Sequence, residues 1–183
     1  QDHFATSTIK DQLNLDRPNV LMTFHRPSNV DENKNLKHLV QELEKVSKTL
    51  DCVFPIHPRT RNKLDDFGFL NRLHLNPRFH ILDPIGYIDF MRLQKDASVI
   101  LTDSGGLQEE STFFCVPCLT VRDNTERPVT ITNGTNKLIG TEYVNIPNEV
   151  EQALSVPVER NTSPELWDGK AAKRIAAIIN NKL

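Results

Sequence analysis

Short apolar runs alternate with amphipathic segments along most of this chain. Such runs are typical of buried strands, and they predict strands at 20–24, 53–56, 79–82, 99–101, 119–121 and 143–146. Between the first two runs, apolar residues at spacings of three and four predict a helix from Leu36 to Leu50. Asp31 or Asn33 is placed to cap the N-terminus of this helix. Similar patterns predict helices at 87–93, 107–114 and 150–154.

The alternation of strands and helices indicates a parallel sheet that is covered by helices on both faces. We therefore predict a Rossmann-like α/β domain over residues 18–155. The first residues, 1–14, predict a helix that precedes the sheet. At the other end, a polar segment at 155–164 leads to a helix near 172–179 with an apolar stripe that must be buried on some surface.

Polar side chains follow the predicted strands at their carboxyl ends. They occur at 23–26, 57–59, 83–84, 102–104 and 122–123. In open parallel sheets, ligands bind beyond the carboxyl ends of the strands, because loops and helix N-termini converge there. We therefore expect the functional site at this edge of the sheet.

A glycine pair follows the apolar run at 99–101, in the segment Leu101–Glu110. A strand, a tight glycine turn and a helix N-terminus together form a seat for an anion, because the backbone can approach the ligand and free N–H groups point at it. Phosphate is the expected guest. Neither the Walker pattern nor the dinucleotide fingerprint is present, so an ordinary tight turn remains the alternative.

Composition limits the classes of protein to which the chain belongs. Its 183 residues suffice for one domain with a core, and 38% hydrophobic with 25% charged residues is typical of a globular protein. A net charge of −2 argues against a broad surface for nucleic acid or acidic membranes, so the basic residues Arg59, Arg61 and Lys63 are interpreted as a solvated face. Without a membrane span or a leader-like segment, we expect a cytoplasmic protein.

The cysteines predict no metal site. Cys115 and Cys118 form a Cys-x-x-Cys pair, but no second such pair or close Cys/His pair completes a zinc site. Redox motifs place the reactive thiol at a helix start, whereas Cys115 ends a helix-like stretch and Cys118 begins a strand. We therefore interpret both as structural residues.

Several segments of the chain match the motifs of a known family. They are 25–31, 55–60, 101–110, 122–128, 133–136 and 168–171. In these segments and in their order, the chain resembles the C-terminal domain of the non-hydrolysing UDP-N-acetylglucosamine 2-epimerases. The distinctive ones are Thr-Asp-Ser-Gly-Gly at 102–106 and Thr-Glu-Arg-Pro at 125–128.

The resemblance implies one half of a two-domain enzyme of the glycosyltransferase-B type, with the active site between two Rossmann-like halves. Residues 1–17 would then be a linker or helix from a missing N-terminal domain, and 156–183 a tail and helix that could pack on that domain. The family's proton-transfer carboxylates belong to the N-terminal half, so we expect this chain alone to be inactive. Family members are usually homodimers.

The implied reaction converts UDP-GlcNAc to UDP-ManNAc by inversion at C2, without a cofactor or a metal. No carbonyl adjacent to C2 acidifies its proton, so direct deprotonation would be slow. Elimination of UDP and its re-addition to the other face avoids this difficulty. Charge then grows on the leaving diphosphate, where preorganised donors contribute most.

The resemblance also implies roles for single residues. Ser104, Gly105 and Gly106 would bind the diphosphate, and Arg127 would neutralise it, because its planar fork can meet two oxygens at once. Glu110, expected in the first turn of its helix, would accept hydrogen bonds from the ribose hydroxyls.

The remaining implied roles concern the base, the reacting sugar and regulation. Phe90 would neighbour the uracil, and the backbone near Ile85 would read its edge. His25 matches the family's active-site histidine and would steady the phosphate or the leaving-group oxygen. Arg26 and His57 match positions that touch a second UDP-GlcNAc, an allosteric activator in some bacterial members.

Other interpretations stay open. Without the motifs, His25 would be a loop residue bonded to backbone and Phe90 a core residue. An epimerase for a modified UDP-sugar, of the diacetamido uronic acid type, is one alternative; a non-catalytic UDP-sugar-binding regulatory module is another. The chain departs from the family pattern at Cys115, where a glycine commonly ends the helix, and at Val129, where glutamate is frequent.

Overall fold

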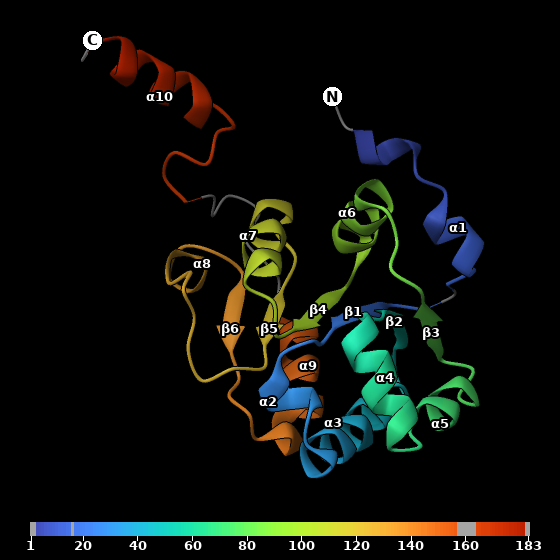
Figure 1. The fold of residues 1–183 in the computed structure, drawn as a ribbon. Coiled ribbons are helices and arrows are strands. Elements are labelled where there is room, and N and C mark those ends of the chain that lie inside the picture. The colour runs from blue at the N-terminus through green and yellow to red at the C-terminus, as the bar shows by residue number, and fades with distance from the viewer. Residues whose placement is uncertain (1–2, 16, 157–163, 182–183) are drawn as a thin grey trace.

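A six-stranded parallel sheet forms the centre of the molecule (Figure 1). The computed structural model describes residues 3–15, 17–156 and 164–181. The strands are β1 (Asn19–Thr23), β2 (Asp51–Pro55), β3 (Phe79–Leu82), β4 (Val99–Thr102), β5 (Cys118–Thr120) and β6 (Asn136–Leu138). They pair in the order β3-β2-β1-β4-β5-β6, which is the Rossmann order. The predicted Rossmann-like class is therefore confirmed.

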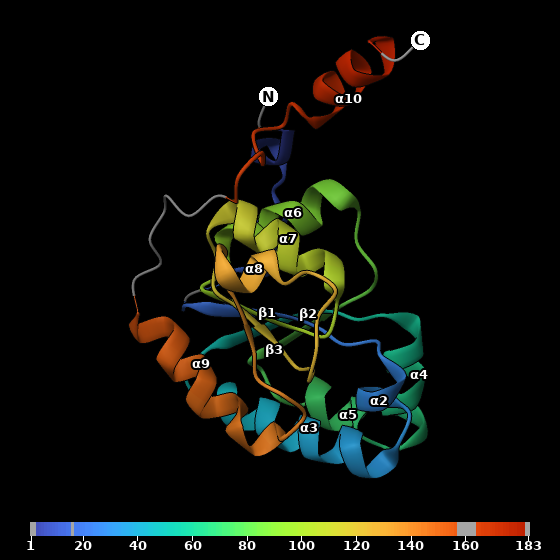
Figure 2. The ribbon, with the colours of Figure 1, turned by 90° about the vertical axis from the view of Figure 1, so that its left-hand side faces the viewer.

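Helices cover both faces of the sheet, as Figure 2 shows edge-on. One layer contains α1 (Ile9–Leu13), α6 (Tyr87–Asp96), α7 (Gly105–Phe114) and α8 (Val129–Thr132). The other contains α2 (Pro27–Val30), α3 (Asn33–Val46), α4 (Pro58–Asp66), α5 (Leu70–His74) and α9 (Ile146–Ser155). Short 3-10 turns occupy His3–Thr6 and Tyr143–Asn145.

Alternate residues of each strand enter different apolar clusters, because successive side chains point to opposite faces of a sheet. Met22 of β1 is buried in the cluster that includes Leu36 of α3. Its neighbour Leu21 is buried in the cluster that includes Leu93 of α6 and Leu107 of α7. Burial on both faces is the physical reason why the strands form nearly continuous apolar runs in the sequence.

The strand predicted at 143–146 is wrong. This segment is the 3-10 turn Tyr143–Asn145 and the start of α9. Tyr143, Ile146 and Val150 are buried together against the α3 face, and their spacing of three and four is helical. The sixth strand is β6, which was not predicted because it has three residues, lies at the sheet edge and contains only one apolar residue.

The predicted cap of α3 is also wrong. Glu32 occupies the N-cap position and makes no side-chain cap hydrogen bond. Asp31, the first predicted cap, pairs instead with Arg59 of α4. Four helices of four to nine residues, α2, α4, α5 and α8, were not predicted, because each is too short to repeat an apolar face.

The C-terminal helix α10 (Ala171–Asn180) stands apart from the layered body in both views (Figures 1 and 2). None of its described residues is buried. In the described segment before it, residues 164–170, Trp167 lines a hollow together with Tyr87 and Phe113. The predicted polar segment at 155–164 lies mostly outside the described residues, so the boundary near residue 156 stays a prediction. In the described part of the chain, no helix has the length and apolar character needed to cross a bilayer.

Candidate functional site

The carboxyl ends of β1, β2, β3 and β4 open onto one shared pocket. Residues predicted for the site contribute to its lining from four loops and from helix α6: His25, His57, Ile85, Phe90 and Ser104. The pocket reaches the boundary between β1 and β4, where the strand order reverses and ligands of doubly wound sheets bind. Residues that are far apart in the sequence, from His25 to Ser104, therefore meet at the carboxyl-terminal edge of the sheet, where the site was predicted.

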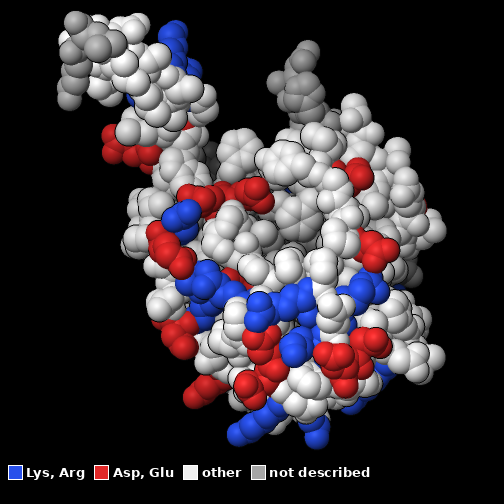
Figure 3. Space-filling model, in the orientation of Figure 1, with Lys and Arg blue, Asp and Glu red and all other residues white. Residues whose placement is uncertain are grey.

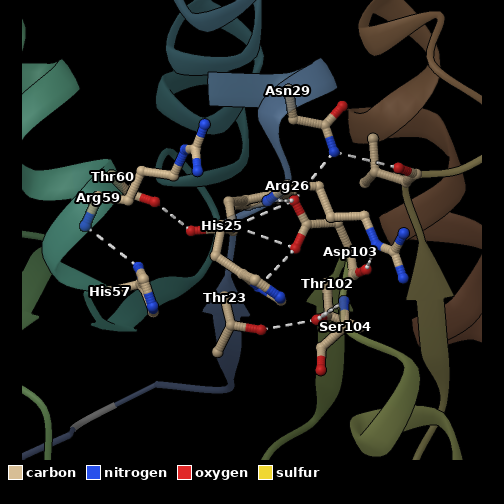
Figure 4. Close-up of polar contacts among 12 residues, drawn as sticks. Thr23, His25, Arg26, Asn29, His57, Arg59, Thr60, Thr102, Asp103 and Ser104 are labelled. Atoms are coloured by element: carbon tan, nitrogen blue, oxygen red, sulfur yellow. Dashed lines mark hydrogen bonds and ion pairs between the residues drawn. The ribbon is translucent and has the colours of Figure 1, made fainter. Parts of the chain in front are cut away.

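A buried aspartate holds His25 at the pocket wall (Figure 4). Asp103 Oδ1 lies 3.0 Å from His25 Nδ1; the Asp103 side chain is fully buried, whereas 41% of the His25 side chain is exposed. The backbone amides of His25 and Arg26 and the side chain of Asn29 also donate to this carboxylate. Burial raises the pKa of Asp103, but these hydrogen bonds more than offset it, so the pKa lies below its usual value.

His57 lies beside His25, with the two ring centroids 5.6 Å apart. It is the N-cap of α4, and its Nδ1 accepts a hydrogen bond from the amide of Arg59 at 3.1 Å. The proton of a neutral His57 ring is therefore on Nε2. Arg59 in turn donates to Asp31 through both Nε and Nη2, which ties α4 to the end of α2. The loops that carry the two histidines are thus fixed relative to each other.

The glycine turn connects β4 to α7. Ser104 is the N-cap, and its amide donates to Thr102 Oγ1 at 2.9 Å. Gly105 and Gly106 are the first helical residues, whose amides are among those that a helix leaves without an internal partner. Neither glycine has a positive φ, and an added Cβ would meet nothing closer than Glu126, 3.7 Å from the Gly105 position. The fold therefore does not require glycine at either position.

Glu126 places a carboxylate beside this helix end. It accepts hydrogen bonds from both terminal nitrogens of Arg122, at 2.9 and 2.8 Å, and lies 3.5 Å from a terminal nitrogen of Arg26. The hydrogen bonds from Arg122 lower the pKa of Glu126 to about 2. Two guanidinium groups therefore hold an anionic group of the protein near the N-terminus of α7.

Arg127 lies outside the pocket lining. Its side chain is 44% exposed, and its Nε is 3.0 Å from Glu109 Oε1 of α7. Its amide donates to Thr125 Oγ1, which donates to the amide oxygen of Gln108. The buried Gln108 side chain also donates to the carbonyl oxygen of Ser104 at 3.2 Å. One side chain thus links the loop of Arg127 to the glycine turn.

Glu110 is in the second turn of α7, so its predicted place in the first turn is wrong. The helix begins earlier than expected, at Gly105, because both glycines of the turn have a helical backbone conformation. Glu110 Oε2 accepts a hydrogen bond at 2.8 Å from Gln94, which is fully buried. Glu110 lines a second hollow, which shares no lining residue with the pocket of His25; its other lining residues are Tyr87, Met91, Glu109, Phe113 and Trp167.

Sequence reasoning gave no role to Asp103 or Gln108, although both lie within the glycine motif. Asp103 directly follows a buried strand, which was the available signal for a buried carboxylate with a partner. For Gln108 there was no such signal. A glutamine in a helix is most often a solvated residue, and the partners of Gln108, Thr125 and Asn136, are distant in sequence.

The described residues contain no cluster of three or more histidine, cysteine or acidic side chains that could hold a metal. Burial raises the pKa of Cys118 to about 11, and Cys115 ends α7 in the left-handed conformation that a glycine commonly adopts there.

On the face that Figure 3 shows, basic and acidic side chains are interspersed over the lower part, below an uncharged hollow.

A sequence profile described as UDP-N-acetylglucosamine 2-epimerase matches residues 1–180. The chain belongs to this family. A UDP-N-acetylglucosamine 2-epimerase of Methanococcus maripaludis is 43% identical over 161 residues, which are 87% of this chain and 43% of that protein. A UDP-2,3-diacetamido-2,3-dideoxy-D-glucuronate 2-epimerase of Pseudomonas aeruginosa is 34% identical over 87% of this chain and 44% of its own length.

The fold also matches solved structures of this epimerase family. The Methanocaldococcus jannaschii UDP-GlcNAc 2-epimerase in complex with UDP-GlcNAc and UDP superposes with a TM-score of 0.85 and 36% identity, covering 97% of this chain and 50% of that one. A glycosyltransferase of kitacinnamycin shares the fold alone, with a TM-score of 0.54 and 15% identity over 77% of this chain and 36% of that one. The glycosyltransferase-B-like class is confirmed, and the chain spans about half the length of its relatives.

Proposed function

We propose that this chain is the UDP-binding half of a UDP-GlcNAc 2-epimerase and that its pocket receives the UDP part of the substrate. The observation that carries the proposal is the convergence of His25, Ile85, Phe90 and Ser104 on one pocket at a helix N-terminus. Phe90 and Ile85 offer an aromatic and an aliphatic surface, which suit the faces of a uracil ring.

The diphosphate is expected at the first turn of α7. The amides of Gly105 and Gly106 and the positive end of the helix dipole favour an anion there, with Ser104 as a further donor. Arg127 reaches the diphosphate by leaving Glu109, and this exchange costs little because both side chains are about half exposed. Glu110 lines the second hollow and not this pocket, and we assign its Oε1 to the ribose hydroxyls because its Oε2 accepts from Gln94.

His25 acts where charge develops in the reaction. When UDP leaves the sugar, negative charge grows on the diphosphate, and a donor that is already in place stabilises it more than water does. The ring of His25 borders both the pocket and the glycine turn, since Ser104 lines the same pocket. The acid and base that act on the sugar belong, in this proposal, to the other half of the enzyme.

The other predictions about the whole protein also stay proposals. Arg26 and His57 would contact a second, activating UDP-GlcNAc; both lie beside His25, one in the chain and one across the pocket. We further propose a cytoplasmic homodimer whose N-terminal domain faces this pocket. The Pseudomonas aeruginosa relative acts on a different sugar by name, so we assign the choice of sugar to that other domain.

Calorimetric titration of the chain with UDP tests the binding step. We expect saturable binding, and about tenfold to 100-fold weaker binding for Arg127→Ala, because a charge-assisted hydrogen bond pair is lost. Arg174→Ala is the matched control, since it also removes an exposed, ion-paired arginine but lies in α10. Uridine, which lacks the diphosphate, is expected to bind Arg127→Ala and the unmodified chain equally. A folded chain that gives no heat with millimolar UDP would contradict the proposal.

A further inference from the structure

Every hydrogen bond that the structure gives to the Asp103 carboxylate comes from an N–H group. The His25 amide donates to both oxygens at 3.1 Å. Oδ1 also faces His25 Nδ1, while Oδ2 also receives the Arg26 amide at 2.9 Å and Asn29 Nδ2 at 3.0 Å. The orientation of Asn29 is itself fixed, because Nδ2 also donates to the carbonyl oxygen of Val121 and Oδ1 accepts from the hydroxyl of Tyr143.

We propose that Asp103 is a positioning residue for His25, which fixes the proton of the neutral ring on Nδ1 and leaves the lone pair of Nε2 for the ligand. An ionised carboxylate accepts hydrogen bonds only. The nitrogen that faces it must therefore carry a proton, and the other ring nitrogen is free in the neutral form. His57 has the opposite tautomer, because its Nδ1 accepts from the Arg59 amide. The tautomer of His25 follows from the geometry alone, and only its role in the reaction rests on the proposed function.

The paired tautomers give the two histidines different chemistry at one pocket. His57 presents an N–H group at Nε2, whereas neutral His25 presents an acceptor there. When His25 takes up a second proton at Nε2 from solvent, the resulting imidazolium lies against the buried Asp103 carboxylate, 3.0 Å away. A donor at Nε2 is then available for the leaving diphosphate oxygen, and its charge is compensated inside the protein.

Replacing Asp103 by asparagine is expected to reverse the tautomer of His25. The Arg26 amide and Asn29 both donate to the Oδ2 position, so the oxygen of the introduced amide must occupy that position to satisfy both donors. Its NH₂ group then occupies the Oδ1 position and donates to His25 Nδ1. The ring proton moves to Nε2, and the ligand meets a donor in place of the acceptor.

Long-range proton–nitrogen NMR spectra of the labelled chain measure the tautomers directly. In spectra of the neutral rings, recorded at alkaline pH, we expect His25 with its proton on Nδ1 and His57 with its proton on Nε2. His25→Gln assigns the His25 signals. In Asp103→Asn we expect His25 to carry its proton on Nε2, with the His57 signals unchanged. Asp51→Asn is the control, because Asp51 is a buried, ion-paired carboxylate at the opposite edge of the sheet.

Three results would overturn the proposal. The first is a proton on Nε2 of His25 in the unmodified chain, which decides the question even if Asp103→Asn does not fold. The second is a folded Asp103→Asn variant in which His25 keeps its proton on Nδ1. The third is a change of the His25 tautomer in Asp51→Asn as well, which would contradict a specific role of Asp103. These spectra are recorded without nucleotide. Failure of the chain to bind UDP would therefore contradict the proposed function, whereas the tautomer of His25 would still be decided by the spectra.

Discussion

The carboxylate of Glu126 lies beside Gly105, with Oε2 3.7 Å from the point that a Cβ on the glycine would occupy. The glycine begins α7, where the helix end favours an anion, and Arg122 and Arg26 surround the same carboxylate. A diphosphate bound at this turn would meet both the arginines that favour it and a carboxylate that repels it. The structure therefore places an attraction and a repulsion at the proposed diphosphate position.

We expect Glu126→Gln to bind UDP about threefold to tenfold more tightly, because a partly screened repulsion between unit charges is removed. The amide oxygen of glutamine can still accept a hydrogen bond from Arg122, so the loop is expected to keep its conformation. Titration calorimetry at low salt measures the change. Glu44→Gln, which breaks an ion pair with Arg72 between α3 and α5, should bind like the unmodified chain. Weaker binding by Glu126→Gln would mean that the carboxylate is needed to orient Arg122.

Gly106→Ala should leave folding intact and weaken UDP binding. Nothing lies within 4 Å of an added Cβ at this position, and alanine is the better helix former, by up to about 1 kcal/mol. The methyl group would stand in the space that the proposal gives to the diphosphate, so we expect about tenfold weaker binding or more. Calorimetry and thermal denaturation of the same sample separate the two effects.

Gly134→Ala is the opposite case and serves as the contrasting variant. Its Cβ would collide with the carbonyl oxygen of Thr130 and with Thr112. Overpacking of this kind typically costs about 1–3 kcal/mol, so the melting temperature should fall. Equal loss of stability in Gly106→Ala and Gly134→Ala would contradict a ligand-related reason for the glycine turn.

Gln108→Leu should both destabilise the chain and weaken UDP binding. The buried Gln108 oxygen accepts from Thr125 and Asn136, and its nitrogen donates to Ser104, so leucine leaves buried polar groups without partners. We expect a loss of about 2–4 kcal/mol in the free energy of unfolding. Chemical denaturation measures it. Gln94→Leu provides the comparison: Gln94 is as deeply buried, but its Oε1 has no hydrogen-bond partner among the residues that the structure describes, so the loss should be smaller.

Acid should weaken the Glu126–Arg122 pair in a defined range of pH. The pKa of Glu126 is lowered from 4.5 to about 2 in the folded chain, so the folded state holds fewer protons than the unfolded state between these values. The stabilisation is therefore fully present above about pH 4.5 and is lost as the pH falls toward 2. Denaturation midpoints from about pH 7 to about pH 2.5 should fall less for Glu126→Gln than for the unmodified chain. Parallel curves would show that Glu126 makes no such contribution.

Five of the six predicted strands were correct within a few residues. Four of them, β1, β2, β4 and β5, are buried on both faces and therefore read as apolar runs, whereas the edge strand β3 is only partly buried. The run 99–101 is an example: Val99, Ile100 and Leu101 are all fully buried in β4. The same logic failed where burial is one-sided. Tyr143 and Ile146 are apolar because they cover α3, not because they lie in the sheet.

The position of the site followed from the strand ends, but its internal contacts did not. His25 and Ser104 were each placed at the carboxyl end of a predicted strand from sequence alone, and they line the same pocket. The contact between His25 and Asp103 joins residues 78 positions apart and depends on the pairing of β1 with β4, which the sequence pattern does not specify. The position of Glu110 depended on where α7 begins, and helix boundaries are the least certain part of a sequence pattern.

The isoleucines of α10 give the chain a property that is separate from its pocket. Ile175, Ile178 and Ile179 each expose more than half of their surface on a helix that has no buried residue. Solvent-facing apolar stripes of this kind tend to self-associate as protein concentration rises. Sedimentation of the chain would then report contacts between these helices rather than the native assembly, and mild detergent or Ile178→Lys should restore a single small species.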